Sequence, residues 1–153
     1  MRTRLTDAFD LTHPIVSAPM AFAAHGRLAA AVSHAGGLGL IGGGYGNAEW
    51  LDGAFAEAGN ARVGCGFITW KMAENAEVLD QVLARNPAAL CLSFGDPAPF
   101  APRIAEAGVP LMAQVQTLRD AQRAADCGAR VIVAQGSEAG GHGERRGPIT
   151  LVP

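Results

Sequence analysis

The sequence predicts an α/β protein of the (β/α)8 TIM-barrel class that contains about the first six βα units of such a barrel. Three observations support this fold class. Short apolar segments alternate with helix-forming segments along the 153 residues. The apolar segments begin near residues 14, 38, 62, 89, 110 and 130, so they recur about every 20 to 27 residues. They are continuous apolar runs, which is typical of parallel strands covered on both faces.

Each apolar segment is bounded by residues that end a strand. Prolines enclose the first segment, and the second runs into Gly42, Gly43 and Gly44. The predicted strands are residues 14–18, 38–41, 62–68, 89–94, 109–115 and 130–134.

The segments between these strands carry helix start and stop signals. Asn47 and Thr117 stand where an N-cap is needed, and prolines open the helix near residue 99. Glycines follow the helix ends, as at Gly36 and Gly59. The predicted helices are residues 26–35, 47–58, 74–84, 99–107 and 118–126.

A doubly wound open sheet accepts the same alternation, but compact, equal units with small residues at the strand ends favour the barrel. A complete barrel takes about 250 residues, whereas the sixth predicted strand ends at Ala134. We therefore interpret residues 1–153 as the N-terminal part of a single barrel domain, either truncated or completed by another polypeptide chain.

The composition excludes several classes of protein. The formal net charge is −2 without basic clusters, which argues against nucleic acid and anionic membrane surfaces as partners. No apolar run approaches the roughly 20 residues of a membrane span, and residues 1–10 lack the apolar core of a secretory signal. Cys65, Cys91 and Cys127 are far apart in apolar segments, which indicates reduced core thiols. We expect a cytoplasmic protein.

The candidate functional residues follow the strands, because active sites of α/β proteins lie at the carboxyl ends of their strands. Glycine-rich segments at 42–46 and 135–143 each fit an ordinary tight βα turn, but together they favour close approach of the backbone to a flat or anionic ligand. The second segment contains His142, a candidate acid or base, with an inert surface histidine as the alternative. Glu138 in the same loop is interpreted as a residue that holds the loop's shape by bonding backbone N–H groups, with a catalytic carboxylate as the alternative.

The residue patterns typical of several other chemistries do not occur in this sequence. The glycine-rich segments match neither the dinucleotide-binding fingerprint nor a P-loop. The serines lack the G-x-S-x-G arrangement of a hydrolase. The histidines show no metal-ligand spacing with acids or cysteines, so we expect no metal site.

The chain resembles the nitronate monooxygenases, formerly called 2-nitropropane dioxygenases. The resemblance rests on the Ala18-Pro19-Met20 motif and on AQGSEAGGHG at 134–143, with GLIGGG at 39–44 and GCGFITW at 64–70 in the same order. These proteins are FMN-containing TIM barrels. The resemblance implies that Ala18, Pro19 and Met20 lie against the flavin ring and that His142 is the catalytic histidine.

The resemblance also implies further FMN contacts. Gly66 stands where many relatives carry Asn, and the family's phosphate-binding loops follow the seventh and eighth strands of the barrel. The remaining implied cofactor-binding residues are Gln114, Gln135, Gly136, Gly140 and Gly141.

The implied activity is FMN-dependent oxidation of alkyl nitronates or nitroalkanes by O2 to a carbonyl compound and nitrite. The same motifs occur in FMN-dependent enoyl-ACP reductases that use NAD(P)H, which is the first alternative. A non-catalytic fragment or assembly subunit is the second. The expected partners are therefore the small-molecule nitronate or nitroalkane and O2, with either a second chain that supplies the missing barrel units or a homo-oligomer.

Overall fold

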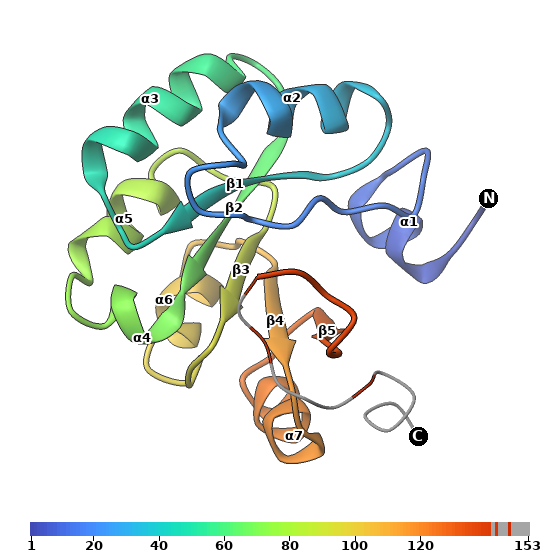
Figure 1. Ribbon diagram of the computed structural model, residues 1–153, viewed down its shortest axis with the longest axis vertical. Helices are drawn as coiled ribbons and strands as arrows, with labels where there is room; N and C mark the ends of the chain where they lie inside the picture. Colours follow the sequence, from blue (N-terminus) through green and yellow to red (C-terminus); the bar gives the residue numbers. More distant parts are fainter. Residues whose placement is uncertain (142, 144–146, 148–153) are drawn as a thin grey trace.

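The computed structural model describes residues 1–141, 143 and 147, and these form a curved parallel sheet with helices along its outer face (Figure 1). The sheet order is β1-β2-β3-β4-β5, and every neighbouring pair is parallel. The strands are β1 Gly39–Gly44, β2 Val63–Ile68, β3 Leu90–Ser93, β4 Leu111–Val115 and β5 Val131–Ala134. The strands follow one another across the sheet in the order of the sequence, which confirms the barrel-type arrangement. In a doubly wound sheet the spatial order of the strands reverses at a switch point.

Seven helices connect or precede these strands within the described residues. Five match predicted helices, and α1 and α4 are short elements that the sequence pattern did not predict. The helix expected over residues 74–84 forms only from Glu77, because residues 73–75 close a turn after α4 instead. The helices are α1 Arg4–Phe9, α2 Gly26–His34, α3 Ala48–Ala58, α4 Thr69–Met72, α5 Glu77–Leu83, α6 Ala101–Glu106 and α7 Leu118–Asp126.

The strand expected over residues 14–18 is reduced to a single parallel bridge between Val16 and Leu38. The backbone begins a ladder there, since the Ser17 N–H donates to the Leu38 carbonyl at 3.0 Å. The next donor in register would be Pro19, which has no N–H, so the ladder stops. The Ser17 hydroxyl instead accepts the Leu40 N–H at 2.9 Å. The segment therefore lies beside β1 as the sequence predicts, but not as a full strand.

Two apolar layers fill the two faces of the sheet. The outer layer joins strand residues such as Ile41, Phe67 and Leu90 to the helices α2, α3, α5 and α6. The inner layer consists of Phe9, Leu38, Leu40, Ala89, Cys91 and Met112. Since Leu38 and Ala89 precede β1 and β3, the inner layer lies toward the amino ends of the strands and leaves their carboxyl ends for a site.

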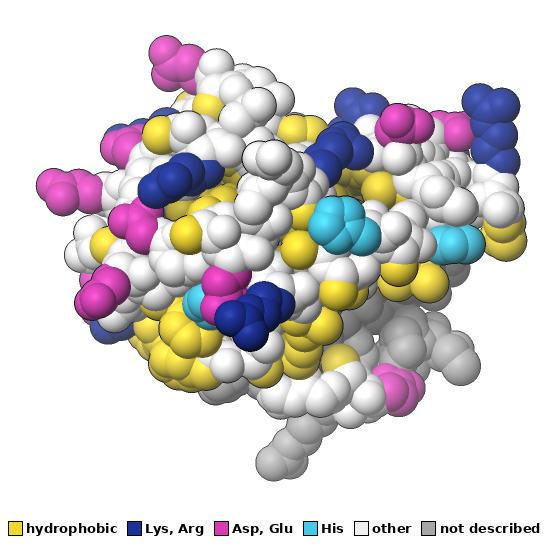
Figure 2. Space-filling view, turned by 90° about the horizontal axis from the view of Figure 1, so that it is seen from above, with side chains coloured by type: hydrophobic (Ala, Val, Ile, Leu, Met, Phe, Trp, Pro, Cys, Tyr) yellow, Lys and Arg dark blue, Asp and Glu magenta, His cyan; other side chains and the backbone are white. Residues whose placement is uncertain are grey.

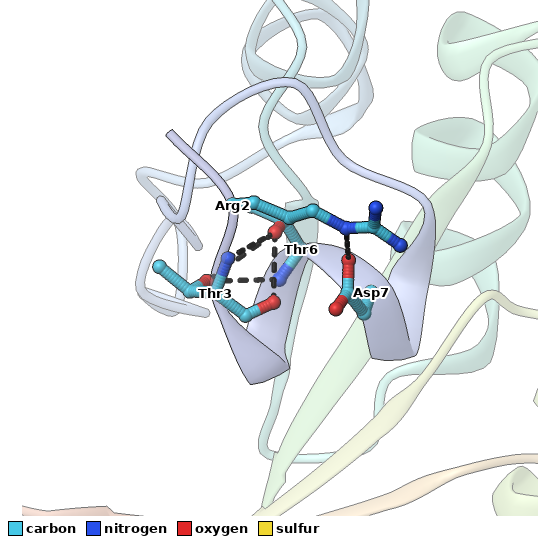
Figure 3. Close-up of polar contacts among 4 residues, drawn as sticks. All are labelled: Arg2, Thr3, Thr6 and Asp7. Atoms are coloured by element: carbon cyan, nitrogen blue, oxygen red, sulfur yellow. Dashed lines mark hydrogen bonds and ion pairs between the residues drawn. The ribbon is translucent and has the colours of Figure 1, made fainter.

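Helix α1 covers this inner layer at the amino ends of the strands. Thr3 and Thr6 bond reciprocally through side chain and backbone as a capping box, and Arg2 pairs with Asp7 at 3.0 Å (Figure 3). Phe9 is fully buried, and Arg62 donates to its carbonyl oxygen across the chain. The short helix is thus held by caps at its start and by tertiary contacts at its end.

The surface carries charges of both signs. On the face seen in Figure 2, acidic and basic side chains are interspersed, with hydrophobic side chains between them. Among the described residues, no helix has the length and apolar character needed to cross a membrane. Strand β5 pairs with β4 and with no other strand of the described chain, and its Ile132 and Val133 are 40% and 37% exposed.

Candidate active site

Two adjoining cavities lie at the carboxyl ends of the strands and along the inner face of the sheet. The first has a volume of about 430 Å³ and the second about 690 Å³. Most of the sequence-predicted cofactor residues line both cavities, and Gly136 lines the second. The shared lining residues are Ala18, Pro19, Met20, Gln114, Gln135, Gly140 and Gly141. The structure therefore brings together residues that are more than 120 positions apart in the sequence.

The floor of the first cavity is the segment 18–21, which lies directly on glycines of β1 and β2. A Cβ atom at Gly42 would fall 2.2 Å from the Met20 carbonyl oxygen, and one at Gly66 would fall 2.4 Å from the Pro19 ring. No side chain fits at either position without moving the segment. Gly66 thus lies under Pro19 and is not among the residues that line either cavity. Gly66 supports the Pro19 ring from below in this geometry, and its contact with the cofactor stays a prediction.

Two glutamine side chains supply amide groups to the lining of both cavities. Gln114 projects from β4, and Gln135 follows β5 directly. The Gln116 amide donates to the Gln135 side-chain oxygen at 2.9 Å, which fixes the orientation of the Gln135 amide. The Gln135 N–H donates to the Val115 carbonyl at 3.0 Å. Both amides are therefore placed by the ends of adjacent strands.

The glycine-rich loop after β5 leaves open space at the cavity. Gly141 has a φ of +80°, and added Cβ atoms at Gly140 and Gly141 would meet no atom of the described residues within 4 Å. The Ala139 N–H donates to the Gly136 carbonyl at 3.1 Å and closes a turn. His142, the predicted catalytic residue, lies outside the described residues, and Glu138 before it is exposed.

Ser93 is a site residue that the sequence reasoning missed. Its hydroxyl is buried, has no hydrogen-bond partner of ordinary geometry among the described residues, and lines the first cavity at the end of β3. Burial raises the pKa of the nearby Cys91 thiol to about 11, and the Ser93 side chain opposes part of this rise. A buried unpaired hydroxyl at a cavity wall favours a polar ligand atom as its partner. The available signal was a polar residue at the carboxyl end of an otherwise apolar strand.

An aromatic group at the cavity mouth was also missed. Phe22 and Tyr45 line the first cavity, with ring centroids 6.0 Å apart. Trp50 of α3 contacts Phe22 edge-on at 5.6 Å. Their separation in sequence hides this grouping, because each ring taken alone fits an ordinary loop or helix.

The residues at these cavities fit the ring system of a flavin. The described lining residues of the first cavity include no charged side chain, which suits a flat, largely uncharged ring. The two amides and the unpaired Ser93 hydroxyl supply hydrogen-bonding groups for its polar edge. Among the described residues, no group of three His, Cys, Asp or Glu side chains could hold a metal ion.

Comparison with known proteins gives the class of the chain. FabK from Thermotoga maritima superimposes with a TM-score of 0.91 at 30% identity, covering 99% of this chain and 50% of FabK. A nitroalkane oxidase from Streptomyces ansochromogenes superimposes with a TM-score of 0.74 at 26% identity, covering 92% of this chain and 51% of the oxidase. The fold of this chain is thus similar to about half of each of these two proteins, which places it in the class of α/β-barrel enzymes.

Sequence comparison narrows this class. Residues 2–62 match the family model described as nitronate monooxygenase. A nitronate monooxygenase of Neurospora crassa is 35% identical over 99% of this chain, and a probable nitronate monooxygenase of Staphylococcus aureus is 26% identical over 92%. The chain is related to the nitronate monooxygenase family, as its motifs predict. It spans about half the length of the curated relatives it matches.

Proposed function

We propose that this chain carries the flavin- and substrate-binding part of an FMN-dependent nitronate monooxygenase. The activity would be oxidation of alkyl nitronates or nitroalkanes by O2 to a carbonyl compound and nitrite. The observation that carries the proposal is the lining shared by the two cavities. It combines the Ala18-Pro19-Met20 motif with Gln114 and with the glycine-rich loop that begins at Gln135. The family's cofactor would supply the two-electron acceptor for the carbon that bears the nitro group.

The chain's own residues would bind and orient the reactants. Met20 and Pro19 form an apolar floor for the flat ring, fixed from below by Gly42 and Gly66. The Gln114 and Gln135 amides and the Ser93 hydroxyl would hold polar atoms of the ring or of the nitro group. Groups placed in advance by strand ends need no reorganisation when charge develops on the ligand.

His142 would act as the base for neutral nitroalkanes or as a donor to the nitronate oxygens. This role comes from the family resemblance and stays a prediction, because His142 lies outside the described residues. A positioned general base contributes about 10²- to 10⁴-fold to rate. We expect His142→Ala to lose turnover of neutral nitroalkanes by that factor while the protein keeps its flavin; retained activity on preformed nitronates would indicate the base role, and its loss the donor role. Unchanged turnover of neutral nitroalkanes by the flavin-loaded variant would remove His142 from the mechanism.

A second candidate function is an NAD(P)H-dependent reductase of enoyl thioesters. The observation that favours it is the superposition on FabK, an enoyl-ACP reductase. The two functions differ in the molecule that reduces the flavin. Anaerobic mixing of the yellow protein with either nitronate or NAD(P)H therefore separates them by the loss of visible absorbance.

We expect bleaching by nitronate, followed by nitrite release when air is admitted. Bleaching by NAD(P)H without any response to nitronate would establish the reductase and reject the nitronate proposal. A colourless protein that takes up no FMN would support the non-catalytic alternative, in which the chain acts only as part of a larger assembly.

A further inference from the structure

Two exposed aromatic residues at the mouth of the first cavity and a half-buried tryptophan behind them form a ledge. We call Phe22, Tyr45 and Trp50 the aromatic ledge. Phe22 is 73% exposed and Tyr45 is 42% exposed, yet their rings stack at a centroid distance of 6.0 Å with an interplanar angle of 27°. Both rings line the first cavity, together with Met20. The ledge is therefore continuous with the surface assigned above to the flavin and substrate.

The ledge is held from behind by specific contacts. Trp50 meets the Phe22 ring edge-on at 74°, and its Nε1 donates to the Gly42 carbonyl of β1 at 3.0 Å. The His25 ring lies 4.4 Å from Trp50, and its Nδ1 bonds the Glu57 carboxylate of α3. Glu57 also pairs with Arg27 at 3.5 Å. These contacts fix the indole and, through it, the ring that faces the cavity.

The backbone at Phe22 is in an unfavourable conformation for its side chain. Its φ is +62°, in the left-handed region that glycine adopts most easily and bulky residues rarely adopt. The turn is closed by the Ala23 and Ala24 N–H groups, which both donate to the Met20 carbonyl. A large ring kept exposed on a strained turn at a cavity mouth is a feature that points to ligand contact.

The chemistry of the lining selects the kind of ligand. Met20 beside the ledge is 47% exposed, and the described residues that line the cavity include no charged side chain. Stacked aromatic rings and a methionine thioether favour planar, apolar groups through ring and sulfur contacts.

We propose that the aromatic ledge is a substrate subsite for an aryl substituent, so that the protein prefers aryl-bearing nitronates to short alkyl nitronates. This inference rests on the proposed nitronate oxidation and specifies its substrate class. The ring of the substrate would lie against Phe22 and Tyr45 while its nitronate group reaches the side-chain amides of Gln114 and Gln135 in the cavity. Phe22 and Tyr45 are specificity-determining residues in this arrangement.

The test compares nitroethane nitronate with 2-phenyl-1-nitroethane nitronate on the purified flavin-loaded protein. We expect kcat/KM to favour the phenyl substrate by about tenfold, the factor that a favourable aromatic contact supplies. Phe22→Gly suits the left-handed backbone and removes the ring, so this ratio should fall toward one without loss of folding. Phe22→Tyr keeps a ring and should preserve the ratio. Trp70→Ala is the matched control, because Trp70 is an exposed aromatic on α4 that lines neither cavity.

A binding measurement separates the subsite from the reaction. Nitrobenzene has no acidic hydrogen next to its nitro group and is not turned over, so calorimetry reports its binding alone. We expect its Kd to rise about 5- to 10-fold in Phe22→Gly and to stay unchanged in Trp70→Ala. If Phe22→Gly changes neither the kcat/KM ratio of the two nitronates nor the nitrobenzene Kd, the inference is overturned while nitronate oxidation stands. Nitrobenzene binding at the ledge in a protein that oxidises no nitronate would reject the proposed function and nitronate as the occupant.

Discussion

Replacement of Gly66 by alanine tests whether the floor of the site rests on β2 as closely as the structure shows. The added Cβ would lie 2.4 Å from both Cβ and Cγ of Pro19 and 3.4 Å from Cβ of Cys91. The Pro19 ring cannot rotate away, since it is closed on its own backbone. Either β2 or the segment 18–21 must therefore move.

Overpacking of this kind costs about 1–3 kcal/mol. For a chain of 150 to 250 residues, 1 kcal/mol lowers Tm by about 2–4 °C, so we expect a fall in Tm between about 2 and 12 °C. Because Pro19 also lines both cavities, Gly66→Ala should weaken flavin binding as well. Calorimetric unfolding and a titration with FMN measure the two effects separately.

Gly53→Ala is the matched control for this experiment. Gly53 lies in α3, where the nearest atom to an added Cβ is His25 Nε2 at 4.0 Å. Alanine there should raise stability by about 0.5–1 kcal/mol, because it reduces the entropy lost in forming the helix. A Gly66→Ala protein that melts at or above the parent temperature with unchanged FMN affinity would refute the close contact between Pro19 and β2.

Three further outcomes test other parts of the molecule. Thr3→Ala removes the capping box of α1 and should lower stability by about 1 kcal/mol, as measured by chemical denaturation; an unchanged midpoint would mean that α1 is held by its tertiary contacts alone. Burial raises the pKa of Cys91 to about 11, so at pH 8 a disulfide reagent should modify only the partly exposed Cys127 in the folded protein, and a fast reaction at Cys91 would contradict its burial. The His25 hydrogen bond lowers the pKa of Glu57, so this carboxylate stabilises the fold above its ordinary pKa of about 4.3, and the stabilisation is lost as the pH falls through the lower folded-state pKa. Glu57→Gln should flatten this acid-side dependence, and an unfolding curve with the same acid slope would show that the bond adds no stability.

The strand-and-helix repeat was predictable because parallel strands covered on both faces and glycine-ended helices leave local signals. Residues 14–18 were harder to assign, since Pro19 ends a ladder whose partner, Leu38, is 22 positions from Val16. Helix α1 escaped prediction because it is six residues long and its capping box uses Thr6 where Glu or Gln is usual. Short helices of this kind depend on tertiary contacts such as the one from Arg62 to Phe9.

Some residues of the candidate site could likewise be predicted from the sequence, and others could not. Motif residues such as Met20 and Gln135 could be placed on the cavity wall from the strand ends that precede them, and their contact with FMN stays a prediction. Ser93 was set aside because its neighbours lack a hydrolase motif, while its unpaired burial is visible only in three dimensions. The aromatic ledge depends on the left-handed turn at Phe22, which no local pattern encodes.

The outer strand β5 offers a surface for backbone pairing. Ile132 and Val133 point to opposite sides of that strand and both remain open to solvent, and the peptide groups along its outer margin face no described strand. A strand with this character is a template on which another polypeptide can add by backbone hydrogen bonding. A polypeptide segment that pairs with β5 would satisfy these peptide groups and cover both side chains at once.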